Sequence, residues 1–89
     1  MTLNVWRAMQ RGLGLSEEQV DYTFDELVLG AVSGNGGGNS GATLEQVISY
    51  VRIGTSVEAP DLYTPVKDSL DRLVGASKLR FEASKFYTV

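Results

Sequence analysis

The chain has 89 residues, a formal net charge of −3 and an apolar content of 43%, which suit one soluble globular domain with a single core. It contains neither cysteine nor histidine, so disulfides, thiolate ligands, cysteine nucleophiles, the commonest general base and the commonest transition-metal ligand are excluded. The longest apolar run, Leu27–Val32, is too short to cross a bilayer, and the first residues lack the pattern of a secretion signal, so we expect a cytoplasmic protein without membrane contact.

The first expected element is a short helix within residues 1–14. Its apolar side chains recur at helical spacing, at Leu3, Trp6, Met9 and Leu13. Gly12 and Gly14 then end the pattern. The helix has two interpretations: it packs on the core, or it is an arm for self-association or for a protein partner through Trp6 and Met9, residue types favoured at interfaces.

A second helix is expected over residues 16–32. Ser16 and Gln19 form a capping box, in which each side chain bonds the other residue's backbone N–H. The clearest amphipathic stripe of the chain follows at Val20, Phe24, Leu27, Val28 and Ala31.

A run rich in glycine, asparagine and serine comes next. Gly36, Gly38 and Gly41 match the G-x-G-x-x-G spacing that can hold a pyrophosphate. A dinucleotide-binding fold needs a strand before these glycines and a second strand after the next helix. Here Leu27–Val32 continues a helical stripe, and no later segment supplies the second strand. The run also lacks the G-K-[ST] of a P-loop. We therefore interpret residues 33–42 as a flexible loop.

Two further core helices are expected. Thr43 and Gln46 form a second capping box ahead of Leu44–Val51. A connection over residues 55–63 separates this helix from the next, for which Thr64 is the expected N-cap and Pro65 the first helical position. The buried stripe of that last helix is Val66, Leu70, Leu73 and Val74.

The end of the chain changes to an alternating period. Residues 79–82 and 86–89 are rich in aromatic and β-branched side chains and flank a three-residue turn at Ala83–Lys85, which predicts a β-hairpin packed on the helices. The expected fold is α+β and mostly α, with residues 15–89 as one domain of three core helices and a C-terminal hairpin.

This order of elements resembles a winged-helix domain. TLEQVISYVRI corresponds to the first helix of a helix-turn-helix, TPVKDSLDRLVGASKLRF to its second helix and the following strand, and FYTV to the returning strand. The x-L-x-R-L-V helix, small-residue turn and K-L-x-hydrophobic strand of that family fall on Leu70, Arg72, Leu73, Val74, Lys78, Leu79 and Phe81. The connection over residues 55–63 is longer than the family's tight turn, and the hairpin turn is short.

The resemblance implies that the last helix enters the DNA major groove and that the hairpin contacts phosphates. The residues it assigns to this contact are Thr64, Lys67, Arg72, Lys78, Arg80 and Lys85. Asp68 and Asp71 oppose such a contact, because a carboxylate beside phosphates is favourable only where it accepts from a cytosine amine. The same cations are also explained as solvated surface charges.

Two functions follow from these residues. The first is a small DNA-binding, transcription-regulator-like module, and the second is a winged-helix module for protein–protein interaction without nucleic acid. DNA binding predicts the cations on one continuous face, with Asp68 and Asp71 turned away or paired with them. A mixed-sign face with exposed Trp6, Tyr50 or Tyr63 favours a protein partner.

Catalysis is not expected. Carboxylate neighbours such as Glu17 and Glu18 are typical of solvated helix surface, and no calcium-loop motif is present. The sequence therefore suggests no catalytic residue, cofactor, metal site or small-molecule ligand.

Overall fold

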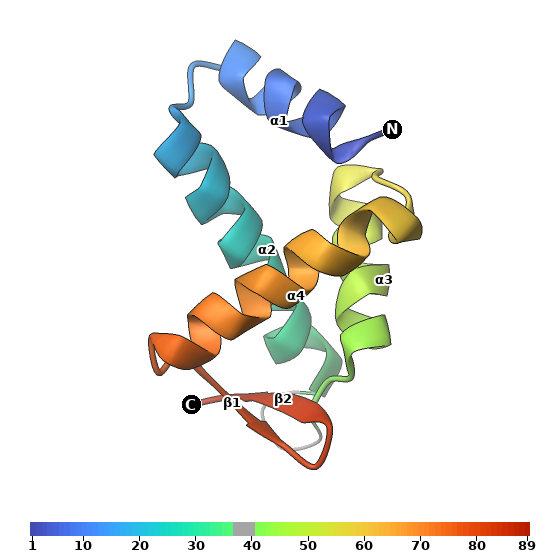
Figure 1. The fold of residues 1–89 in the computed structure, drawn as a ribbon, viewed down its shortest axis with the longest axis vertical. Helices are drawn as coiled ribbons and strands as arrows, with labels where there is room; N and C mark the ends of the chain where they lie inside the picture. The colour runs from blue at the N-terminus through green and yellow to red at the C-terminus, as the bar shows by residue number, and fades with distance from the viewer. Residues whose placement is uncertain (37–40) are drawn as a thin grey trace.

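The computed structural model describes residues 1–36 and 41–89. The elements are α1 (Leu3–Gly12), α2 (Glu17–Gly36), α3 (Leu44–Thr55), α4 (Ala59–Gly75), β1 (Leu79–Glu82) and β2 (Lys85–Thr88) (Figure 1). The expected class is confirmed: the chain is α+β and mostly α, with a short N-terminal helix and a C-terminal antiparallel hairpin.

Helix α2 lies at the centre of the fold. The capping box at its start is confirmed, because Ser16 Oγ accepts from the Gln19 N–H and Gln19 Oε1 accepts from the Ser16 N–H, at 3.2 and 2.8 Å. Its inner ridge is buried, with exposed fractions of 0–4% at Val20, Phe24, Val28, Ala31 and Val32. Against α2 pack α1, α3, α4 and β2.

The predicted loop over residues 33–42 is wrong at both ends. Helix α2 continues through Gly36, four residues beyond Val32, and residues 37–40 lie outside the described part of the chain. At the other end Ala42 pairs with Phe86 of the hairpin through two backbone hydrogen bonds of 2.9 and 2.8 Å. Because the segment is rich in glycine, the sequence indicated neither the extension of α2 to Gly36 nor the pairing of Ala42 with the hairpin.

The connection between α3 and α4 is much shorter than predicted. The Thr43 capping box is confirmed, and α3 ends at Thr55 with Ser56 in the left-handed region at φ 59°. Helix α4 then begins at Ala59, so Thr64 lies inside the helix and does not cap it. Proline misled the sequence interpretation. Pro60 lies in the first turn, where its missing N–H has no intrahelical partner to lose, while Pro65 is tolerated within a well-packed helix.

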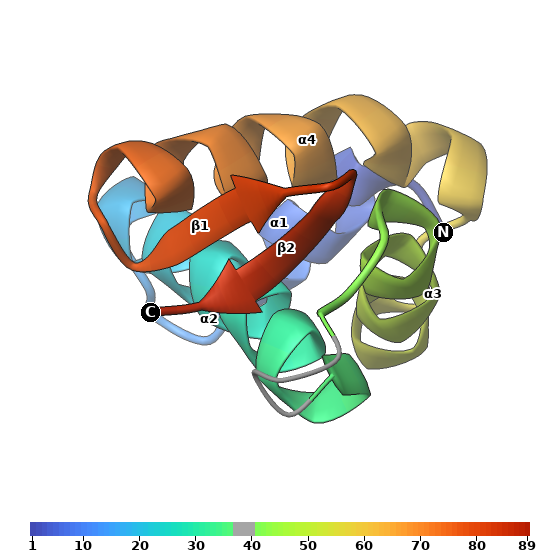
Figure 2. The same cartoon turned by 90° about the horizontal axis from the view of Figure 1, so that it is seen from below.

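The hairpin is confirmed, with a turn one residue shorter than predicted. Glu82 pairs with Lys85, which begins β2, and the turn consists of Ala83 and Ser84 at φ 51° and 64°. Positive φ at both central residues is the type I′ geometry that matches the twist of a hairpin. Figure 2 shows the hairpin beneath α4, with the segment leading into α3 beside β2.

Helix α1 is held on α2 in part by an aromatic contact. The Trp6 ring meets the Phe24 ring edge-on, with centroids 5.9 Å apart, and Trp6 is 5% exposed. The rest of the predicted stripe is not buried: Leu3 is half-buried, and Met9 and Leu13 are 52% and 77% exposed. The expected arm residues are therefore separated, because Trp6 faces the core and only Met9 faces outward.

Substitution of Gly41 by alanine is expected to destabilise the fold. Gly41 has φ +72°, and a Cβ there would lie 2.7 Å from Cε1 and Cζ of Tyr87. We expect the free energy of unfolding in urea to fall by about 1–3 kcal/mol. The control is Gly12→Ala in α1, where a Cβ meets nothing within 4 Å, so stability should be unchanged or slightly raised. Equal losses in both variants would contradict the explanation.

Candidate functional site

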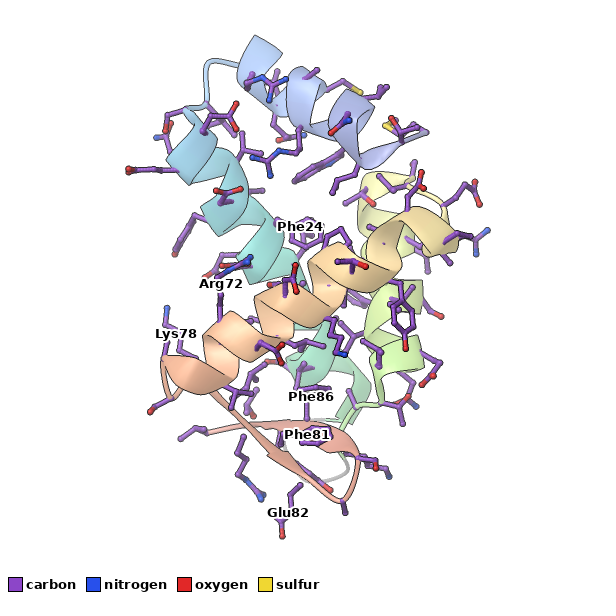
Figure 3. The ribbon with its side chains drawn as sticks, viewed as in Figure 1. Phe24, Arg72, Lys78, Phe81, Glu82 and Phe86 are labelled. Atoms are coloured by element: carbon purple, nitrogen blue, oxygen red, sulfur yellow. The ribbon has the colours of Figure 1, made fainter. Side chains whose placement is uncertain are left out.

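The six predicted DNA-contact residues do not share one face. Thr64 and Arg72 line a cleft of about 250 Å³ between α1, α2 and α4. Lys67 lines a different groove, between α4, the start of α3 and the hairpin. Arg80 and Lys85 share the face of the hairpin opposite to Phe81 and Phe86, because paired residues alternate between the two faces. Lys78 is exposed in the turn after α4 (Figure 3).

Two of the predicted cations are already paired with carboxylates. Arg72 Nη2 donates to Asp25 Oδ1 at 2.7 Å, and this hydrogen bond is the main cause of the raised pKa of Arg72. Arg80 donates to Glu82, and its guanidinium carbon lies 4.4 Å from the centroid of the Tyr87 ring. A phosphate would have to compete with these carboxylates for both arginines.

Asp25 joins α2 to α4 through a buried hydroxyl as well as through Arg72. Ser69 is fully buried, and its Oγ donates to Asp25 Oδ1 at 2.5 Å. A buried hydroxyl without a partner is costly, so this carboxylate satisfies a group that the fold has removed from water. Asp25 therefore has a structural role that sequence spacing could not reveal, since Ser69 and Arg72 lie 44 and 47 residues away.

A second charge cluster holds α1 against α2. Arg7 donates to Glu17 and to Asp21, and Arg11 donates to the other oxygen of Glu17, each at 2.8 Å. The bonds from Arg7 and then Arg11 lower the pKa of Glu17 below its usual 4.5. The cations of α1 are thus compensated within the chain.

The exposed face of α4 carries charges of both signs. Asp61, Asp68 and Asp71 are exposed on it, and so are Lys67 and Arg72. This is the mixed-sign face that the sequence criterion associates with a protein partner. Of the three aromatic residues in that criterion, Tyr50 and Tyr63 are 42% and 52% exposed, whereas Trp6 is buried.

A largely apolar groove lies between α4 and the hairpin. This α4–hairpin groove has a volume of about 580 Å³ and is lined by Thr43, Leu44, Glu45, Lys67, Asp71, Val74, Phe81, Ser84 and Phe86. Phe81 is 56% exposed, although its ring packs 4.7 Å from that of Phe86 (Figure 3). The alternating pattern predicted a hairpin packed on the helices, but the sequence could not show that Phe81 would line a groove beside α4.

Comparisons of the chain with known protein families, with curated proteins and with solved structures find no match. Among the helices that the structure describes, none has the length and apolar character needed to cross a membrane. Within residues 1–36 and 41–89, no three acidic side chains come together in the way that a metal site requires.

Removal of the Asp25 carboxylate should destabilise the protein. In Asp25→Ala the buried Ser69 hydroxyl and the Arg72 guanidinium lose their shared acceptor, so the free energy of unfolding should fall by about 1–3 kcal/mol. Asp68→Ala is the matched control on exposed α4 surface and should change stability by no more than about 0.5 kcal/mol. Urea denaturation measures both, and a stable Asp25→Ala variant would refute the role assigned to Asp25.

The attachment of α1 should weaken in acid. Because folding lowers the pKa of Glu17, its contribution to stability is present above pH 4.5 and is lost as the pH falls through the folded-state value. Trp6 is the only tryptophan, so its fluorescence reports whether α1 stays packed. Glu17→Gln should reduce the change in Trp6 emission below pH 4.5. The control Glu18→Gln should show the same dependence of emission on pH as the wild type. Identical profiles for all three proteins would exclude Glu17 as the titrating group.

Proposed function

We propose that this chain is a winged-helix-like module for protein–protein interaction, and that the α4–hairpin groove binds a segment of the partner. The observation that carries the proposal is the combination of an apolar groove with an exposed Phe81 beside a helix whose outer face carries charges of both signs. The winged-helix part of the proposal rests on the resemblance of the sequence, with which an order of helices followed by a C-terminal hairpin is compatible.

The groove favours a particular chemistry in the partner. Its floor is formed by apolar groups of Leu44, Val74, Phe81 and Phe86. Its rim carries two carboxylates, Glu45 and Asp71, and one ammonium group, Lys67, and the chain as a whole has a net charge of −3. A segment with one large apolar side chain next to lysine or arginine complements both the floor and the rim.

DNA binding is the second candidate, and the short α3–α4 connection favours it. Only residues 56–58 separate the two helices, and this length is compatible with the three- to four-residue turn of a helix-turn-helix. Against this candidate, Asp25 and Glu82 occupy two of its arginines, and Asp68 and Asp71 face the region where phosphates would lie. Contacts from Lys67 and Lys78 would give a slope of log K against log salt of about −1.8.

A selection experiment separates the two candidates. Peptides are selected from a random displayed library on the wild-type protein, and their affinities are then measured on variants. Phe81→Ala should weaken binding about tenfold or more, because it removes part of the groove floor. Ile53→Ala is the matched control, since Ile53 is 81% exposed and lies outside the groove, and it should bind like the wild type.

Charge reversal on the rim tests the expected partner chemistry. Asp71→Lys should shift the selected peptides from basic to acidic flanking residues, because the rim then carries two cations and one carboxylate. Labelled duplex DNA of random sequence is titrated at two salt concentrations in parallel. If the protein binds DNA in a salt-dependent manner and the Phe81 and Asp71 substitutions do not change peptide binding, DNA binding becomes the favoured function.

A further inference from the structure

The outer edge of β1 has backbone groups that point away from the hairpin. Phe86 directs its N–H and C=O toward Ala42, on the far side of β2 from β1. Phe86 and Phe81 are cross-strand partners, and residues of an antiparallel pair direct their backbone groups either both inward or both outward. The N–H and C=O of Phe81 therefore point outward, and in the described part of the chain β1 pairs with β2 alone.

The side chains along this edge carry charges of opposite sign around an exposed ring. Edge strands commonly discourage pairing with another chain through charges, a proline, a bulge or a short length, whereas opposite charges can meet their complements in a second copy. Here Phe81, at 56% exposure, lies between Arg80 and Glu82, which are both exposed on the opposite face of the hairpin. Figure 3 shows Phe81 on the side of the hairpin toward α4 and Glu82 pointing away from it.

We propose that β1 pairs with β1 of a second copy of the chain, antiparallel, about a two-fold axis that passes beside Phe81. In this register the two Phe81 residues exchange both of their N–H···O=C hydrogen bonds. Arg80 of each copy lies opposite Glu82 of the other, so opposite charges meet twice across the new strand pair. The edge of β1 is thus complementary to itself, as a two-fold interface between identical copies must be.

The charges along the edge select this register. A two-fold pairing centred on Arg80 would place arginine opposite arginine, and one centred on Glu82 would place carboxylate opposite carboxylate, both of which are unfavourable. The register centred at Phe81 uses the outward-pointing N–H and C=O of Phe81, and it joins the ion pair of Arg80 with Glu82 in each copy into a cluster of four charges of alternating sign.

The interface is expected to be small and the dimer reversible. A pairing of four-residue strands buries less surface than the roughly 1,200 Å² of a stable interface, which suggests a Kd on the order of 100 µM. The inference does not depend on peptide binding in the α4–hairpin groove, because it uses the backbone edge and the residues on both sides of Phe81.

Sedimentation equilibrium of charge-reversed variants tests the proposal. The mass of the wild type should rise from 9.6 kDa toward twice that value as concentration increases to about 1 mM. Arg80→Glu and Glu82→Arg should each remain monomeric, because each sets like charges opposite one another. An equal mixture of the two single variants should associate again, since every contact between position 80 of one variant and position 82 of the other then joins a carboxylate to a guanidinium.

The double variant R80E/E82R should behave like the wild type and keeps the test valid if a single variant fails to fold. Amide resonances add a check of the register: that of Phe81 should shift with concentration, whereas that of Arg80, bonded to Tyr87 within the hairpin, should not. A wild type that stays monomeric to about 1 mM, or a mixture that does not associate, would overturn the proposal without affecting the proposed groove function.

Discussion

The fold depends on the burial of one ridge of α2. Val20, Val28, Ala31 and Val32 have no exposed surface, and Phe24 has almost none, because each neighbouring element covers part of the same helix. Burial of one such aliphatic or aromatic side chain contributes about 1.5–3 kcal/mol, so the ridge supplies a large share of the stability of so small a domain. The other helices and the hairpin hold their positions because they share this ridge, and the groove and the strand edge take their geometry from it.

Sequence patterns located the elements whose signals are local. Both capping boxes, at Ser16 and at Thr43, predicted helix starts that the structure confirms, because these hydrogen bonds lie within a single turn. The alternation in residues 79–89 predicted the hairpin, whose strands are also close in sequence because a two-residue turn joins them. The errors came from glycine and proline, which interrupt isolated helices but occur within the helices of this fold, as Gly34 does in α2 and Pro65 in α4.

The functional residues were less predictable, since their environment is made by distant parts of the chain. Helical spacing placed Lys67 and Arg72 on the outward side of α4, which is correct, but it could not show that Asp25 lies within 2.7 Å of Arg72. It could not reveal an unfilled space beside Phe81 either, because that space depends on how the hairpin lies relative to α3 and α4. Pairing between elements, rather than residue type, decides which charges remain available to a partner.

The arginines of α1 and α4 form ion pairs with α2, while the hairpin lies at the end of the fold away from α1 (Figure 1). A partner that approaches the hairpin meets an uncompensated backbone edge and an apolar groove with an acidic rim. Phe81 belongs to both features, so it is the position at which the two proposed contacts meet.

The attachment of α1 has a consequence for its response to ionic strength. One part of it is the buried contact of Trp6 with Phe24, and the other is a cluster of ion pairs in which Arg11 and Glu17 are 46% and 59% exposed. Dissolved ions screen exposed pairs strongly, since the Debye length shortens from about 10 Å at 0.1 M to about 3 Å at 1 M. They do not weaken the contact between the rings, so in concentrated electrolyte the N-terminal segment stays attached through the packing of Trp6 and the backbone hydrogen bonds of Met1 with Ser56 and Glu58.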